Sequence, residues 1–493
     1  NKKSIDMDLV YSQRARMFLD RVVGYTISPL VQKHVIKMTQ HHAAGRVMSV
    51  ALRIISERQK EIDSFKPEEF WDIFLETKID DKPLTLQLCS YKKKPLKINN
   101  QKEALKIKED ILRANSGEIT EVKEKKVSRN PKPPLTTVSM QQLAANKLGF
   151  QVKTTMEVAQ ELFAQGFISY HRSDSVRLEP EEIKKAQDAL NAEHGTKYVS
   201  PTPVHYKAKS GSKVQDAHTA IQPTDATRAK IDGSAQMQKL YDLIRKRFLA
   251  CQSVPAELKL KSIIADIGDY GFKATASSVV FDGFLKIVGD DDDNEDESSA
   301  TILPDVKKGE TIPVQDVDAK QKFTKPPAHF NDASLVKALE ANGVGRPSTY
   351  ANTLGKLEQR TYIGRDKKKL FATEVGCLVT DFLVQEFPDL FNVQFTSQME
   401  DILDEIEDGK KEWKEVLNKF WKDLSDKIKN ANLKTAKLED TGKICHLCGS
   451  RVLKKSGSFH GVYYLCERPE CKARFNKATG DPLVEKAVGS CPN

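Results

Sequence analysis

The run Arg129-Asn-Pro-Lys-Pro-Pro134 limits the possible folds of this chain more than any other stretch. Proline lacks a backbone N–H and fixes φ, so this run can continue neither a helix nor a central strand of a sheet. It therefore predicts a linker, after which a new domain opens at Thr136. A chain of 493 residues with 39% hydrophobic residues is long enough for three or four domain-sized units.

Before the linker, a helical pattern gives way to a strand pattern. The apolar stripe of residues 11–24 predicts a helix that ends at Gly24, and a second helix is expected from about Gly45. From 65 to about 127, short alternating runs predict strands, interrupted by a lysine-rich helix at about 102–114. The first part of the chain thus contains two different kinds of structure.

After the linker, the order is helix, short strand and helix. A Thr154-x-x-Glu157 capping box predicts the start of a helix that ends at Gly166. The segment 167–170 is expected to form a short strand, and Glu179-Pro-Glu-Glu begins a helix that runs to Leu190.

Strand-like runs return at about 258–321 and are broken by the acidic stretch 289–297. Dense like charge repels itself, so this stretch predicts a flexible surface loop rather than a rigid metal site. From about 331 to 431 the pattern is helical again, beginning with a helix capped by Asn331 or Asp332 and closed by Gly343.

Tyr170 and Arg172 are the first candidates for chemistry. In an extended chain alternate side chains share a face, so these two project the same way and His171 projects to the other side. A tyrosine, with a reference pKa of about 10, attacks a phosphodiester only where cations favour the phenolate, and the Arg172 fork matches two phosphate oxygens. On spacing alone, a buried strand tyrosine beside an exposed arginine is the commoner arrangement.

Two further stretches have the residues of a phosphate site. A helix from Gly45 would place Arg46, Ser49 and Arg53 toward one side, although a solvated basic face has the same pattern. The run Gly345-Arg-Pro-Ser-Thr-Tyr350 predicts a helix start with proline in its first turn, a hydroxyl at its cap and amides that face a phosphate. It also fits a helix-turn-helix fragment, with strands at 362–363 and 370–371 as its wing.

Four of the eight cysteines gather near the C-terminus as Cys445-x2-Cys448 and Cys466-x4-Cys471. Two thiolate pairs at this spacing can close a tetrahedral Zn²⁺ site, which would compensate for a very small core. Clustered thiols favour a reducing compartment over a disulfide scaffold.

The net charge of +9 agrees with binding of a polyanion without establishing it. No run of about 18 apolar residues and no signal-peptide pattern is present, so we expect a soluble intracellular protein that does not enter a membrane.

Four motifs, in one consistent order, resemble those of bacterial-type topoisomerase I in the type IA DNA topoisomerase family, and the likeness extends from Tyr11 through the cysteine cluster. Met48 stands where the family usually has glutamine, so a glutamine-specific DNA contact is in doubt there. The motifs are Gly45-Arg-Val-Met-Ser49, Gly166-Phe-Ile-Ser-Tyr-His-Arg-Ser-Asp-Ser175, Asp216-Ala-His-Thr-Ala-Ile-Gln-Pro-Thr224 and Ala333 to Tyr350.

The resemblance implies that Tyr170 cuts one DNA strand and stays linked to its 5′ phosphate, with Arg172 and His218 as catalytic partners. A lone histidine is more often structural, but in this motif His218 can bond a phosphate or relay a proton. The residues then expected to contact DNA are Arg46, Ser49, Arg53, Arg346, Ser348 and Thr349.

The implied fold is multidomain α+β: the type IA topoisomerase ring of a helical base, a strand-rich arch and a tyrosine domain, plus a C-terminal zinc ribbon. The final residues look like the start of another cysteine half-site. The expected order is base (1–64), arch (65–130), catalytic tyrosine domain (131–256), arch with acidic loop (257–325), base (326–435), four-cysteine ribbon (440–478) and a truncated further segment (479–493).

The implied activity is ATP-independent relaxation of negatively supercoiled DNA by transient single-strand cleavage, strand passage and religation. The expected partner is DNA, with single-stranded segments preferred, and the protein is expected to be a monomer. It is expected in the cytoplasm, associated with the nucleoid, or in an organelle if the source is a eukaryote. The family also carries an N-terminal Toprim domain, with an acidic residue, a lysine and carboxylates for Mg²⁺, and we expect those ligands to lie outside this chain.

Two other classes stay open. One is a single-stranded DNA-binding fragment without catalytic activity, which a cleavage assay would separate from an enzyme. The other is a nuclease that uses Tyr170 transiently and releases DNA ends instead of resealing them. Because the family's magnesium ligands are expected elsewhere, residues 1–493 alone are expected to bind single-stranded DNA without relaxing a plasmid.

Overall fold

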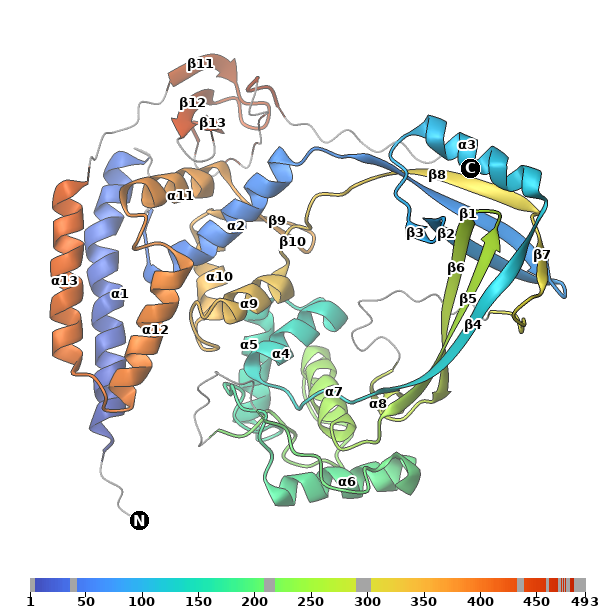
Figure 1. Cartoon of the computed structure of the whole chain (residues 1–493). Coiled ribbons are helices and arrows are strands. Elements are labelled where there is room, and N and C mark those ends of the chain that lie inside the picture. The colour runs from blue at the N-terminus through green and yellow to red at the C-terminus, as the bar shows by residue number, and fades with distance from the viewer. Residues whose placement is uncertain are drawn as a thin grey trace. The chain divides into compact units, whose positions relative to one another are not determined.

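The computed structural model divides the chain into two compact units (Figure 1). The helical unit comprises Asn1–Ser64, Thr137–Glu161 and Pro327–Asn493, and the sheet unit comprises Phe65–Thr136 and Leu162–Pro326. The structure describes residues 5–35, 42–207, 218–289, 303–431, 439–457, 461–468, 471, 473, 475 and 479–482. The predicted acidic loop lies outside them from residue 290 onward.

The helical unit is organised around one long helix, α1 (Met7–His34). Its buried residues recur every four positions and belong to the large core of this unit. The expectation that this helix ends at Gly24 is wrong, because the buried stripe continues on both sides of the glycine. Burial along the stripe outweighs the roughly 1 kcal/mol that a glycine costs inside a helix. The stripe consists of Ala15, Leu19, Val23, Ile27 and Val31.

Shorter helices and a hairpin complete the helical unit. Of the two residues predicted to cap α9, Asn331 is the cap, and it forms a reciprocal capping box with Ser334 that was not predicted. The predicted wing strands form an antiparallel hairpin. The elements are α2 (Arg46–Ser64), α4 (Thr137–Leu143), the π-helix η1 (Ala144–Leu148), α9 (Asp332–Ala341), α10 (Tyr350–Gln359), β9 (Ile363–Asp366), β10 (Lys369–Ala372), α11 (Glu374–Glu386), α12 (Val393–Glu407) and α13 (Trp413–Asn430).

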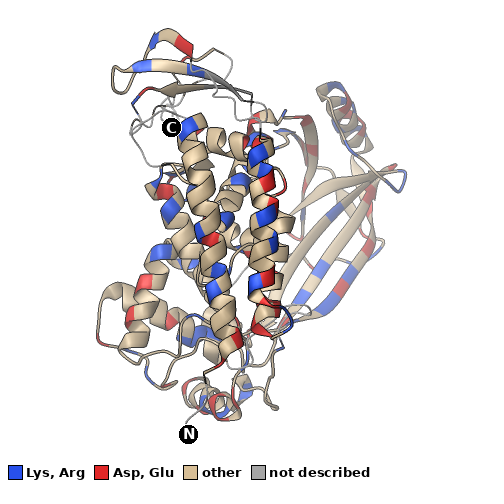
Figure 2. Cartoon of the chain, turned by 90° about the vertical axis from the view of Figure 1, so that its left-hand side faces the viewer, with Lys and Arg blue, Asp and Glu red and all other residues tan. Residues whose placement is uncertain are grey.

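Charge on this unit is mixed in sign. In Figure 2, basic and acidic residues alternate along the long helices that face the viewer, without a broad patch of one sign. Basic and acidic residues are therefore intermixed along these helices.

The two strand-rich stretches of the sequence form one sheet in the sheet unit. Its order is β7-β4-β5-β6-β2-β1-β8, with β3 paired to β2, and all the pairs are antiparallel. The strands are β1 (Glu69–Ile79), β2 (Lys82–Tyr91), β3 (Lys94–Pro95), β4 (Ser116–Arg129), β5 (Ala256–Ile267), β6 (Tyr270–Phe281), β7 (Thr311–Pro313) and β8 (Asp316–Phe323). β4 ends where the predicted proline linker begins.

Helices fill the rest of this unit. The lysine-rich helix is present as α3 (Gln101–Ala114) and buries its apolar side in the core of the sheet. A second core gathers the elements between β4 and β5, which the sequence assigns to the tyrosine domain. These elements are α6 (Pro180–His194), the 3-10 helix η2 (Thr196–Tyr198) and α7 (Ala235–Ala250), with α8 (Leu285–Val288) after β6.

The predicted domain limits at 64/65 and 325/326 lie close to the division between the two units, whereas residues 137–161 pack with the helical unit instead of with the Tyr170 region. The helix α5 (Val152–Ala164) therefore crosses from one unit into the other. It begins two residues before Thr154, so the predicted capping box is wrong. The finer partition into base, arch and tyrosine domain stays a prediction.

The cysteine ribbon is a three-stranded sheet of β11 (Glu439–Ile444), β12 (Arg451–Gly457) and β13 (Gly461–Cys466). Leu465 belongs to the large core of the helical unit, and Leu453 packs against that core. No helix among the described residues is long and apolar enough to cross a membrane.

Candidate functional site

The segment around Tyr170 is irregular, with bends at Ser169 and His171, and is not a strand. α5 ends at Ala164, Gly166 has φ +74, and the predicted strand is reduced to one bridge between Ile168 and Pro223. The alternation expected of an extended chain is nevertheless present: Tyr170 is 46% exposed and Arg172 is exposed, while His171 between them is 1% exposed. The phenol and the guanidinium thus both face solvent.

Serine hydroxyls hold this segment against the stretch that carries His218. The Ser169 hydroxyl donates to the Ala220 carbonyl at 3.0 Å, and the Ser173 hydroxyl donates to the Thr219 carbonyl at 2.5 Å. The Ser169 N–H also donates to the Gln222 carbonyl at 2.9 Å. Backbone bonds thus pair this segment with the later stretch at one point, and serine hydroxyls add further bonds between the two.

This packing brings His218 beside Tyr170, as the resemblance predicts. The two rings are tilted, with centroids 6.3 Å apart. Nδ1 of His218 lies 3.3 Å from a carboxylate oxygen of Asp174, and both side chains are about one-third exposed. The sequence analysis gave Asp174 no role. Asp174 nevertheless stands in the same motif as Tyr170, two residues after Arg172, and so continues the series of every second residue that begins at Tyr170.

His171 is the buried neighbour of the tyrosine. Burial, and next the charge of Arg172, lower the pKa of His171 from 6.5 to about 4. The ring is therefore neutral near pH 7, and the permanent cation in this part of the motif is Arg172, two residues after Tyr170.

The predicted phosphate contacts belong to the helical unit, and the first of them lies in its interior. Arg46, the first residue of α2, is 1% exposed and pairs with Glu400 at 2.6 Å and Asp20 at 3.2 Å. Its Nη2 makes no hydrogen bond within the described residues. The expectation of an open basic helix face is thus wrong for Arg46, because two carboxylates draw its guanidinium inward.

Glu400 connects three arginines. Its carboxylate lies 2.5 Å from Arg16, 2.6 Å from Arg46 and 3.8 Å from Arg346. Burial alone would raise the pKa of Glu400, but the three guanidinium groups outweigh it and hold the pKa below its usual value. The carboxylate therefore stays ionised and fixes the arginines around it.

Ser49 and Arg53 do not join this group. The Ser49 hydroxyl is buried and accepts a hydrogen bond from the Gly45 N–H at 3.1 Å. Arg53 donates to the Phe391 carbonyl at 3.0 Å and pairs with Glu57 at 2.8 Å. Neither side chain lies open for a phosphate in the way that the helix pattern suggests.

The Arg346 turn differs in detail from its prediction. Residues 347–349 form a turn and α10 begins at Tyr350, so Pro347 is not in the first turn of the helix. The Thr349 hydroxyl bonds the backbone of Arg346 instead of capping the helix. Arg346 is about one-third exposed and pairs with Asp404 at 2.8 Å, and Ser348 is exposed. The turn thus presents an arginine and a hydroxyl at the surface.

The four predicted cysteines come together. Their sulfur atoms all lie within 4.8 Å of one another, with Cys445 3.6 Å from Cys471 and Cys448 3.3 Å from Cys466. Zn–S bonds of about 2.3 Å in a tetrahedron place sulfurs roughly 3.8 Å apart, so the set fits a metal ion. Among the described residues, no other group of three or more histidine, cysteine or acidic side chains could hold one.

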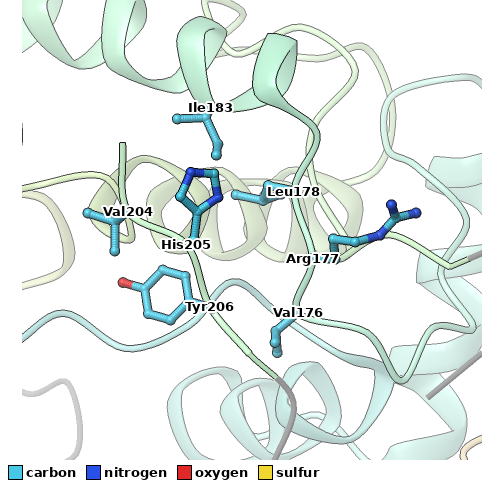
Figure 3. A pocket seen from close by; sticks show the side chains of 7 residues that line it. All are labelled: Val176, Arg177, Leu178, Ile183, Val204, His205 and Tyr206. Carbon is cyan, nitrogen blue, oxygen red and sulfur yellow. The ribbon is translucent and has the colours of Figure 1, made fainter. Parts of the chain in front are cut away.

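A small pocket of the sheet unit holds none of the predicted residues (Figure 3). Its lining includes Arg177, His205 and Tyr206, and its volume is about 30 Å³. It is too small for a nucleotide, so the open surface at Tyr170 is the better candidate for substrate chemistry.

Comparison with known proteins agrees with these motifs. A family model described as DNA topoisomerase matches residues 4–418. The chain is 37% identical over 491 residues to DNA topoisomerase 1 of Haemophilus influenzae, covering 96% of this chain and 55% of that protein. It is 36% identical over 506 residues to DNA topoisomerase 1 of Salmonella typhimurium, covering 98% and 57% respectively. The chain thus spans about half the length of these curated relatives.

A solved structure has a similar fold. Full-length topoisomerase I from Thermotoga maritima matches with a TM-score of 0.76 and 31% identity, covering 98% of this chain and 79% of that chain. The expected multidomain α+β fold is thus shared along nearly the whole chain.

Proposed function

Because this chain belongs to the type IA family of bacterial DNA topoisomerases, we propose that the complete protein carrying it relaxes negatively supercoiled DNA by cutting and resealing one strand through Tyr170. The observation that carries the proposal is the group around this tyrosine: an exposed phenol, an exposed arginine two residues on, and a histidine beside the ring. A phosphodiester is the substrate that such a nucleophile and cation suit.

In the proposed step, the Tyr170 oxygen attacks phosphorus and gives up its proton while a P–O tyrosine bond forms. The bond from phosphorus to the 3′ oxygen breaks, and that oxygen takes up a proton. The phosphotyrosyl ester keeps the energy of the broken bond, so attack by the 3′ hydroxyl reverses the step without ATP. Passage of another strand through the break, after cleavage and before religation, changes the linking number of the DNA.

Arg172 is proposed to stabilise the charge that develops on the phosphate oxygens, because its fork can bond two of them. A carboxylate only accepts hydrogen bonds, so the proximity of Asp174 to Nδ1 favours the tautomer of His218 that carries its proton there. Nε2 is then the nitrogen that can exchange a proton with the phenol or the leaving oxygen.

The DNA strand is proposed to be single-stranded where it is cut, with its backbone held by the Arg346 turn and by the arginines around Glu400. Support comes from the exposed Ser348 and the part-exposed Arg346. Arg46 stays a prediction as a DNA contact, because its side chain is buried. Ser49, Arg53 and Thr349 stay predictions as DNA contacts. A monomer that works on the nucleoid in the cytoplasm is part of the same proposal.

Zinc is the proposed ion of the cysteine set, and its chemistry is structural: four thiolates around one ion replace a hydrophobic core in a small ribbon. Mg²⁺ is the ion that the family implies at the cleavage site. Its ligands stay an expectation, since no group of carboxylates among the described residues gathers to hold it.

The test is plasmid relaxation without ATP by the complete gene product and by its Tyr170→Phe variant. The phenylalanine ring keeps nearly the same shape and lacks the nucleophilic oxygen, so single-stranded DNA should still bind and relaxation should vanish. Equal relaxation by the wild type and by Tyr170→Phe would contradict the proposal. Binding without relaxation by either would favour the DNA-binding alternative, and linear or nicked products would favour a nuclease.

A further inference from the structure

Phe163, in the last turn of α5, contacts the candidate nucleophile and its buried neighbour together. Its ring meets Tyr170 edge to face, with centroids 5.4 Å apart and planes at 72°. It also lies 5.7 Å from His171, tilted by 46°. Edge-to-face packing at this distance is a favoured arrangement of aromatic rings, so the pair has a defined geometry and not only proximity.

Tyr170 has few other means of keeping its orientation. It stands in a segment without regular strand pairing and is 46% exposed. Within the described residues no group hydrogen-bonds its hydroxyl, so the ring contacts are what orient the side chain. Besides Phe163, the rings within reach are His171 at 5.5 Å and His218 at 6.3 Å.

The three rings differ in how firmly they are anchored. His171 is the next residue in the chain after Tyr170, and His218 contacts Asp174, which belongs to the same segment as Tyr170. Phe163 is anchored by a helix, beside the buried Leu162. Of the three, it is the one whose position does not depend on the segment that carries Tyr170.

We propose that Phe163 is a positioning residue, which holds the Tyr170 ring in the orientation from which its oxygen attacks a phosphodiester. The effect on rate rests on the function proposed above, whereas the effect on the ring itself does not. Misplacing a reacting atom by about 1 Å can cost roughly 100-fold in rate, so a contact that fixes one ring can matter even though Phe163 bonds no DNA.

The test compares Phe163→Ala, Phe163→Leu and Phe163→Tyr in the complete protein. In single-turnover cleavage of a labelled single-stranded oligonucleotide, Ala should slow cleavage by about tenfold or more. Tyr retains the ring and should restore most of the rate, whereas Leu fills space without a ring edge and should not. Single-stranded DNA affinity should stay within about twofold. The matched control is Phe281→Ala, which removes another aromatic partner in the same unit, stacked on Tyr198 at 5.5 Å.

A second readout needs no activity. In protein labelled on its tyrosine rings with ¹³C, the Tyr170 signals are assigned as those lost in Tyr170→Phe. Phe163→Ala should shift them toward values of a freely rotating ring, Phe163→Tyr should leave them close to wild type, and Phe281→Ala should leave them unmoved.

Unmoved Tyr170 signals in Phe163→Ala would overturn the proposal, and so would full rescue of cleavage by Phe163→Leu. A loss of DNA affinity that matches the loss of rate would also overturn it, because Phe163 would then be a stacking platform for a base. If Phe163→Ala shifts the Tyr170 signals but the wild-type protein cleaves no DNA, the inferred ring contact is supported and the proposed function is contradicted.

Discussion

Nδ1 of His218 lies 3.3 Å from a carboxylate oxygen of Asp174, 44 residues earlier in the chain. This pair predicts that the two residues act as a unit. We expect His218→Ala to lower the rate of plasmid relaxation by roughly 100-fold, the usual size of a proton-transfer contribution, and Asp174→Asn to lower it by less. The double variant should be no slower than His218→Ala.

A double-mutant cycle in relaxation rates checks this. Asp225→Asn is the control, since that carboxylate bonds Thr227 in the same unit and not a histidine. Losses that multiply in the Asp174 and His218 double variant would mean that the two residues act independently.

His171 predicts a dependence of stability on acid. Its pKa is about 4 in the folded chain, where burial and then Arg172 disfavour the charged ring, against 6.5 without them. Between these values the unfolded chain binds more protons, so the stability that the neutral ring contributes is full above about pH 6.5. It is lost as the pH falls toward 4. The full loss is on the order of 3–4 kcal/mol, because the pKa falls from 6.5 to about 4 and each pKa unit corresponds to about 1.4 kcal/mol.

Urea unfolding at pH 7 and pH 5 measures this effect. His171→Leu should lose less stability between the two pH values than the wild type, and His194→Leu, at the end of α6, serves as the control. Equal losses in wild type and His171→Leu would assign the acid sensitivity to other groups.

Arg346 predicts a change in the salt dependence of DNA binding. Arg346→Ala should weaken binding of single-stranded oligonucleotides of any sequence and reduce the slope of log K against log salt by about 0.7 for each phosphate that the variant no longer neutralises. Arg58→Ala is the control, because Arg58 pairs with Glu61 and is not among the residues expected to bind DNA. Fluorescence anisotropy over a range of salt gives both slopes, and an unchanged slope for Arg346→Ala would make that arginine structural.

The cysteine set predicts one zinc per chain. Changing Cys445 and Cys448 to serine removes two of four ligands, so metal analysis should find that zinc no longer binds. Because Leu465 of the ribbon is in the core of the helical unit, apolar dye binding should rise as the ribbon loosens. Cys89→Ser, an exposed thiol on β2, should change neither measurement. Zinc retained in the double variant would indicate other ligands.

Features that depend on local sequence were predictable. The alternation of Tyr170, His171 and Arg172 follows from the two-residue period of an extended chain, and the cysteine set follows from ligand spacing. The capped helix α9 follows from one asparagine at its start. The alternation and the cap are decided within a few residues, and the cysteine set by two short motifs close together in the chain, which is why pattern reasoning found them.

Features that depend on distant residues were not predictable. Arg46 is buried because Glu400, 354 residues away, pairs with it, and no periodicity of α2 contains that information. α1 continues through Gly24 because its buried stripe packs into the unit core, which outweighs the local stop signal. The segment at Tyr170 is held by serine bonds to Thr219 and Ala220, about 50 residues later in the chain, and stays irregular instead of forming the predicted strand.

The measurement that tests the central claim most directly is the identification of the residue that becomes linked to DNA. The complete protein is incubated with a single-stranded oligonucleotide and denatured rapidly, and the DNA-linked peptide is isolated after protease and nuclease digestion. Mass spectrometry should find a nucleotide joined through its 5′ phosphate to Tyr170, with no adduct in Tyr170→Phe. An adduct on any other residue, or an undiminished yield from Tyr170→Phe, would contradict the account.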